Sequence, residues 1–230
     1  QFAVQFAAAA FLGGVVLVLL ACLEALGRTL APSCLRGYRE ITLGRWRGRA
    51  IRSEISNGFG IAGLILGTEG LGQLAERVLP GVQILAPADG VGPVDSVVPA
   101  LNALDVLGAA VMMSALIVMS VLVVRKRVGG VLPAAAIIAA MVALLGPSGI
   151  SPYAVGVAVM FPGILVVALG ASLGGWLGLA IGMFVSGCVS MALALLSGVP
   201  GYGASGAILL VVAAAPLLLL AAGRKSTTTG

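Results

Sequence analysis

The chain has 230 residues, of which 60% are hydrophobic and only 9% are charged, with a formal net charge of +5. Soluble domains carry roughly 25% charged residues, so this composition excludes a soluble fold. The sequence contains no histidine, which excludes a Ser-His-Asp triad, a His-ligated haem and an HExxH zinc site within this chain.

Apolar runs bounded by charged loops or by Pro and Gly clusters predict seven transmembrane helices, because about 20 apolar residues cross the hydrocarbon of a bilayer. They lie near residues 4–24, 54–75, 105–124, 128–145, 153–169, 173–196 and 204–223. The last four come from a stretch without any charged residue. One long bent helix or a re-entrant pair near Gly170 is the alternative. We expect an all-α, polytopic integral membrane helix bundle, with residues 1–230 forming a single transmembrane domain.

Arginine and lysine in short loops mark the cytoplasmic side of a membrane. The basic residues gather in three groups: the loop 25–53, Arg125 to Arg127, and Arg224 with Lys225. With seven spans, all three groups fall on one side and the loop 76–104 falls on the other. The sequence therefore predicts an outside N-terminus and an inside C-terminus. A bacterial cytoplasmic membrane is the expected location, with an organelle membrane as the alternative.

Carboxylates at membrane depth are costly and often functional. Glu69 lies in the outer third of the second predicted span, Asp105 opens the third from outside, and Glu24 lies at the inner end of the first. We expect Glu69 and Asp105 to face one another and bind a cation, a proton or a substrate, with Glu24 as a further candidate. The alternative is that Glu69 and Asp105 lie at the interface in water or against Arg77.

The loop 25–53 combines arginines with aromatic residues, as segments that bind anionic lipid headgroups do. An acidic partner subunit is an equal candidate, and nucleic acid is not expected as a partner. The residues predicted to make these contacts are Arg36, Arg39, Arg45, Trp46, Arg47, Arg49 and Arg52. Apolar residues from Ile41 to Ile51 also favour a short surface helix in this loop.

Glycines recur every four residues around the sixth predicted span, at Gly170, Gly174, Gly178 and Gly182. Positions four apart lie on nearly one face of a helix. Small residues let membrane helices approach closely. This spacing predicts a close helix contact, either with a neighbouring helix or with a second copy of the chain.

The three cysteines Cys22, Cys34 and Cys188 are far apart in the sequence and form no CxxC pair. We therefore expect no bound metal and no cofactor. An enzyme acting on lipid has the least support, because acids are few. The preferred hypothesis is a membrane transport component, either a permease subunit or a channel. The alternative is a non-catalytic subunit of a larger membrane complex or a homo-oligomer.

Overall fold

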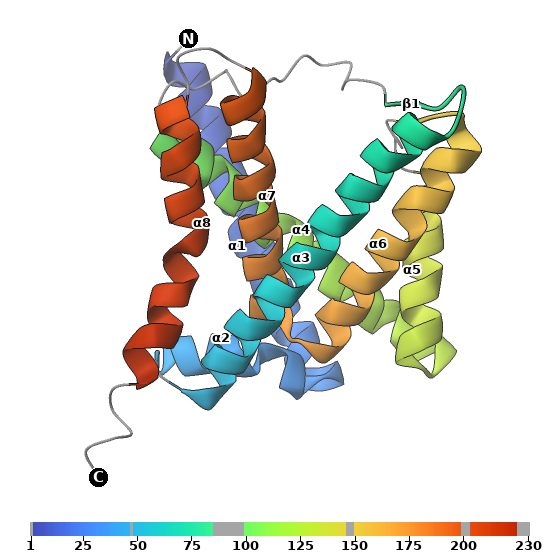
Figure 1. Ribbon diagram of the computed structural model, residues 1–230. Helices are drawn as coiled ribbons and strands as arrows, with labels where there is room; N and C mark the ends of the chain where they lie inside the picture. The colour runs from blue at the N-terminus through green and yellow to red at the C-terminus, as the bar shows by residue number, and fades with distance from the viewer. Residues whose placement is uncertain (1, 47, 85–98, 146–149, 199–202, 225–230) are drawn as a thin grey trace.

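The computed structural model of the chain describes residues 2–46, 48–84, 99–145, 150–198 and 203–224 (Figure 1). Its long helices are α1 (Phe2–Leu30), α3 (Arg49–Val78), α4 (Pro99–Val128), α5 (Val131–Leu145), α6 (Tyr153–Leu173), α7 (Trp176–Gly198) and α8 (Gly203–Arg224). The shorter elements are the 3₁₀ helix η1 (Pro32–Leu35), α2 (Arg36–Thr42), β1 (Gln83–Ile84) and β2 (Ile150–Ser151). The two strands pair antiparallel, with Ile84 opposite Ile150.

Four helices of this described part are long and apolar enough to cross a membrane. The candidate spans are Gly13–Leu30, Ala103–Val128, Tyr153–Ser172 and Trp176–Leu196. Helix α5 is apolar but has 15 residues, which reach only about 22 Å at the rise of an α-helix. The chain is therefore an all-helical protein with several potential spans. The count of seven crossings stays a prediction.

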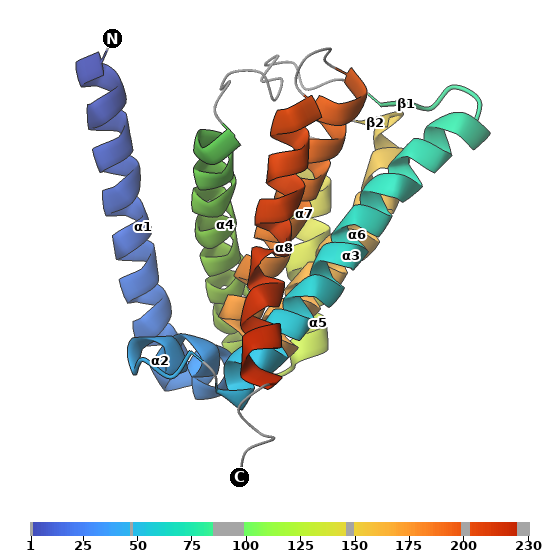
Figure 2. The same cartoon turned by 60° about the vertical axis from the view of Figure 1, so that its left-hand side comes forward.

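Successive long helices run in alternate directions between the two ends of the bundle (Figures 1 and 2). Helix α1 starts at the end where β1 lies, and α8 finishes at the opposite end. The connection from α1 to α3 and the turn from α4 to α5 lie at the end where α8 finishes. These are the parts of the chain that carry the first two basic groups.

Helix α7 lies at the centre of the bundle and packs against α3, α4, α6 and α8. Its most extensive contact is with α3, which crosses the bundle diagonally (Figure 1). Helix α1 contacts mainly α4 and η1, and its far end stands apart from the other helices (Figure 2). The largest buried cluster joins α1, η1, α3, α4, α6 and α7, and includes Leu23, Leu35, Val118 and Leu179.

The break between α6 and α7 lies slightly later than the sequence indicates. Helix α6 continues through Gly170 to Leu173, and α7 begins at Trp176. Gly175 between them has a φ of +81°, a left-handed conformation that a glycine adopts without steric cost. The prediction of a break is therefore confirmed in this region. Gly170 and Gly174 both precede α7, so the four spaced glycines do not share one helix face as their spacing predicts.

Candidate functional site

Glu69 lies on α3 and faces α7 across the bundle. Its carboxylate Oε2 accepts a hydrogen bond of 2.7 Å from the hydroxyl of Ser190, which lies 121 positions further along the chain. The recorded partner of Glu69 is therefore Ser190 and not Asp105. Asp105 is exposed near the start of α4, and no contact between the two carboxylates is recorded in the described ranges.

Glu24 lies in the second half of α1 and pairs with Arg28, one helical turn further on. An exposed pair of this kind contributes at most about 1 kcal/mol to stability. Glu24 also lines a hollow at the α2 end of the bundle together with Arg28 and Arg39. The structure therefore places Glu24 among arginines, whereas Glu69 lines a different cavity.

Glu69 is one of the residues lining a cleft of about 630 Å³ between α3, α4, α5, α6 and α7. Most of its described walls are isoleucine, valine and methionine side chains. The polar side chains among these lining residues, Thr68, Glu69 and Gln73, all come from α3. One carboxylate in an otherwise apolar wall is suited to a ligand with an apolar body and a cationic or hydrogen-bond-donating group.

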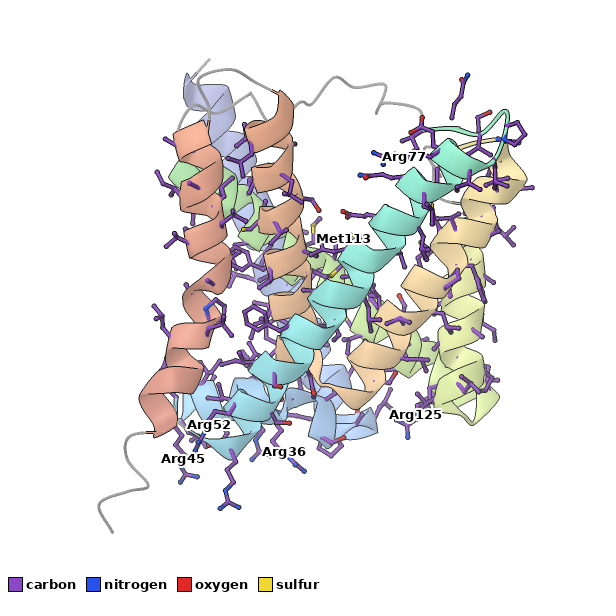
Figure 3. All side chains as sticks on the ribbon, in the orientation of Figure 1. Arg36, Arg45, Arg52, Arg77, Met113 and Arg125 are labelled. Atoms are coloured by element: carbon purple, nitrogen blue, oxygen red, sulfur yellow. The ribbon has the colours of Figure 1, made fainter. Side chains whose placement is uncertain are left out.

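Three methionines line the same cleft, Met113 from α4, Met160 from α6 and Met183 from α7. Met113 projects between α7 and α3 (Figure 3). Methionine is unbranched and polarisable, so it adapts its shape to irregular apolar ligands. The cleft reaches from the β1–β2 pair, where Ile84 and Ile150 line it, towards the middle of α6. Its lining residues come from segments 65–84 and 113–183, so it forms only in the folded bundle.

The described arginines among those predicted to contact lipid or a partner belong to α2, the turn after it and the start of α3, at the end opposite β1. Arg36, Arg45, Arg52 and Arg125 are at this end, and Arg77 is at the other end (Figure 3). Arg36, Arg39, Arg45 and Arg49 are exposed, Arg52 is half-buried, and Arg47 lies outside the described residues. Trp46 is also exposed. The first two basic groups therefore share one end of the protein.

The predicted surface helix in this loop is wrong. Helix α2 ends at Thr42, and Ala50 and Ile51 already belong to α3. Gly44 has a φ of +70°, which ends α2, because a left-handed residue cannot continue a right-handed helix. Ile51 is buried while Leu43 and Trp46 are exposed, so these apolar residues share no single face.

The sequence did not single out Glu54, which joins three elements at the basic end. Glu54 lies in the second turn of α3 and is only 6% exposed. Its Oε1 accepts a 2.7 Å hydrogen bond from the backbone N–H of Gly37 in α2. The N–H groups of Leu177 and Gly178 in the first turn of α7 interact favourably with the same carboxylate. Glu54 thereby places its carboxyl oxygens beside the unpaired N–H groups at the start of α7.

Glycines leave the space that the Glu54 carboxyl group occupies. A Cβ atom added to Gly37 would lie 2.6 Å from its Cδ, and one added to Gly175 would lie 2.8 Å from it. Within the described residues, Oε2 of Glu54 and the indole N–H of Trp176 are buried without a hydrogen-bond partner. The ring of Trp176 packs edge-on against Tyr38 of α2, with centroids 5.6 Å apart. Together these contacts fix α2 to the start of α7.

Cys34 of η1 is buried beside this junction. Burial raises the pKa of its thiol, and the negative charge of Glu54 raises it further, while Arg125 opposes the rise. A thiol with a raised pKa is a poor nucleophile. Cys34 is therefore an inert structural residue in the native fold, and its reactivity reports on opening of the junction.

The glycines with four-residue spacing all lie against α3, although Gly170 belongs to α6, Gly174 to the connection after it, and Gly178 and Gly182 to α7. A Cβ atom on Gly170 would lie 2.9 Å from Ile61, and one on Gly174 would lie 3.5 Å from the Cβ of Asn57. On α7, Cβ atoms at Gly178 and Gly182 would lie 3.0 Å and 2.9 Å from carbonyl oxygens of α3. The close neighbour is thus a helix of the same chain.

No group of three or more histidine, cysteine, aspartate or glutamate side chains suited to a metal ion occurs among the described residues. Comparison of the chain with protein-family models, with curated proteins and with solved structures gives no match.

Proposed function

We propose that this chain is a transport component of a membrane, and that its substrate occupies the cleft beside Glu69. The observation that supports this most strongly is the cleft itself. It has a volume of about 630 Å³ and apolar walls from five helices, with a carboxylate on one side. Ligand sites in proteins are commonly apolar clefts of this size with a few placed polar groups.

The composition of the walls favours a permease subunit over an ion channel. A water-filled ion path requires rings of carbonyls, charges or other polar groups. The described lining of the cleft carries three polar side chains, all on one helix. We infer that the substrate is an amphiphile with an apolar body, and that Glu69 binds its cationic or N–H group.

Transport through Glu69 is testable with the full chain in proteoliposomes that enclose DNA, using ethidium, a planar aromatic cation, as the probe. We expect wild type to accelerate ethidium entry over protein-free liposomes. Glu69→Gln removes a charge-assisted contact worth about 1.5–3 kcal/mol, so entry should slow at least about tenfold. Fluorescence of the enclosed DNA measures the rate.

Asp105→Asn is the matched control, because it removes the same charge from α4 outside the cleft lining. Its rate should stay at the wild-type value. An equal loss of the entry rate in both variants would support the predicted Glu69–Asp105 pair. A wild-type entry rate in Glu69→Gln would show that Glu69 is not part of the site.

We further propose that the chain crosses the membrane seven times, with its basic end in the cytoplasm. The alternation of helix directions and the grouping of Arg36, Arg45, Arg52 and Arg125 at one end support this topology (Figure 3). Each arginine favours the side with anionic lipid by about 1 kcal/mol.

Topology is measurable with a membrane-impermeant maleimide. Arg45→Cys and Lys225→Cys should resist labelling in intact cells, whereas Arg77→Cys should react. All three should react after lysis, which controls for buried thiols. Labelling of Arg45→Cys and Lys225→Cys on opposite sides would require an even number of crossings.

A further inference from the structure

Three arginines surround a hollow at the basic end of the bundle. The hollow measures about 440 Å³ and lies between η1, α2 and the turn that follows α2. Arg36, Arg39 and Arg45 line it together with Ser33 and Glu40. It is separate from the cleft at Glu69, with which it shares no lining residue.

The backbone after α2 brings the third arginine to the hollow. Arg36 and Arg39 are three positions apart on α2, so they lie on one side of that helix. Gly44, with a φ of +70°, then reverses the chain. The N–H of Gly44 donates to the carbonyl of Ile41 at 2.9 Å, and the N–H of Arg45 donates to the carbonyl of Glu40 at 2.8 Å. This pair of bonds is a Schellman motif, and it returns Arg45 to the hollow.

The charge balance of the hollow favours an anion. Three guanidinium groups face one carboxylate, that of Glu40. In the described part of the chain, no ion pair or side-chain hydrogen bond is recorded for Arg36, Arg39 or Arg45. Arg36 does interact electrostatically with Glu54 on its other side. Guanidinium groups bind phosphate through paired N–H bonds, and the hydroxyl of Ser33 adds a further donor.

Two exposed apolar side chains indicate how deep the hollow would lie in a membrane. Leu43, which also lines it, is 62% exposed, and Trp46 is 53% exposed. Tryptophan concentrates at the boundary between hydrocarbon and headgroups. The exposed leucine side chain has a lower free energy in lipid than in water. With these side chains in the interface, we expect the three arginines to lie at the depth of the lipid phosphates.

We propose that the hollow formed by Arg36, Arg39 and Arg45 binds the phosphate group of an anionic membrane lipid. The arginines hold the phosphate oxygens, and Leu43 and Trp46 contact the upper part of the acyl chains. This site does not depend on the transport activity proposed above. It uses four of the seven contact residues predicted from the basic loop: three arginines for the phosphate and Trp46 for the acyl chains.

The test measures lipid binding to the purified full chain in detergent by native mass spectrometry, with phosphatidylglycerol as the probe. The variant R36Q/R39Q/R45Q should weaken binding at least about tenfold, because charge-assisted hydrogen bonds are worth about 1.5–3 kcal/mol each. The matched control, R125Q/K126Q/R127Q, removes the same charge from the same end and should retain wild-type affinity. Because Arg36 also faces Glu54, R39Q/R45Q provides a second variant that keeps the junction intact.

Three other results would overturn the proposal. Equal weakening by both triple variants would mean that the basic end attracts lipid only through its overall charge. Wild-type affinity in R36Q/R39Q/R45Q would exclude the hollow as the site. Binding of inorganic phosphate as tight as that of phosphatidylglycerol would assign the hollow to a soluble phosphate compound instead of a lipid. Phosphatidylcholine, whose phosphate is balanced by its own ammonium group, should bind more weakly than phosphatidylglycerol.

Discussion

Replacing Glu54 by alanine is expected to detach α2 from the bundle while the long helices stay folded. The substitution removes the acceptor of the Gly37 N–H, a buried bond of 2.7 Å. A buried N–H left without a partner costs about 1–3 kcal/mol. The start of α7 also loses the carboxyl group that faces its first N–H groups, which adds to the loss. We expect a lower unfolding temperature in detergent and faster hydrogen exchange in residues 32–42.

Alkylation of Cys34 gives a residue-specific measurement of the same event. The thiol is buried, and Glu54 contributes to its raised pKa. In Glu54→Ala, both the burial and the electrostatic contribution decrease, so Cys34 should react with a maleimide much faster than in wild type. Peptide mapping distinguishes Cys34 from Cys22 and Cys188.

One further variant separates shape from charge at position 54, and a second removes a carboxylate elsewhere at the same end as a control. Glu54→Gln keeps an acceptor for Gly37 but loses the charge, so it should destabilise less than Glu54→Ala and accelerate Cys34 alkylation only slightly. Glu24→Gln removes an exposed carboxylate at the same end and should leave the unfolding temperature unchanged within error. A Glu54→Ala protein with wild-type stability and an unreactive Cys34 would show that Glu54 does not hold the junction.

The helices were predictable from the sequence because a membrane leaves the backbone few alternatives. Inside hydrocarbon every N–H and C=O needs an internal partner, so a long apolar run is expected to form a helix. Gly and Pro clusters then mark the ends, as Gly175 does between α6 and α7. The bounds of the long helices accordingly contain the predicted spans to within a few residues.

The sites were less predictable, because they depend on residues that are distant in the sequence. Glu69 meets Ser190 across 121 positions. Glu54 touches Gly37 on one side and the start of α7 on the other. An isolated acid at the edge of an apolar run resembles an ordinary interfacial residue, and no local pattern reveals that glycines on two other elements make room for it. The surface helix predicted between Ile41 and Ile51 does not form for a local reason, because Gly44 ends α2.

The glycine pattern predicted a close contact, but spacing alone could not identify the neighbour. At the centre of the contact between α3 and α7, a glycine of each helix lies against the backbone of the other. A Cβ atom on Gly58 of α3 would lie 2.8 Å from the carbonyl oxygen of Gly178, and one on Gly182 of α7 would lie 2.9 Å from the carbonyl oxygen of Gly58. In contrast, Gly63 and Gly67 of α3 have nothing within 4 Å. Glycines of the same helix α3 are therefore expected to respond oppositely to substitution by alanine.

Gly58→Ala is expected to push α3 and α7 apart along their most extensive contact. The added methyl group would meet backbone, which cannot rotate away as a side chain can. It would also lie 2.8 Å from the side chain of Ile181. Overpacking of this kind costs about 1–3 kcal/mol, and Gly58→Leu should prevent folding. The unfolding temperature in detergent measures the effect.

Gly67→Ala is the matched control in the same helix. Its methyl group enters open space, and alanine is favoured over glycine in a helix by about 1 kcal/mol, so the variant should be as stable as wild type or more stable. Because α3 also carries Glu69 and α7 carries Ser190, Gly58→Ala should weaken ethidium transport as well. If Gly58→Ala and Gly67→Ala had the same unfolding temperature, the backbone approach of α3 and α7 would have to be wider than it is in this structure.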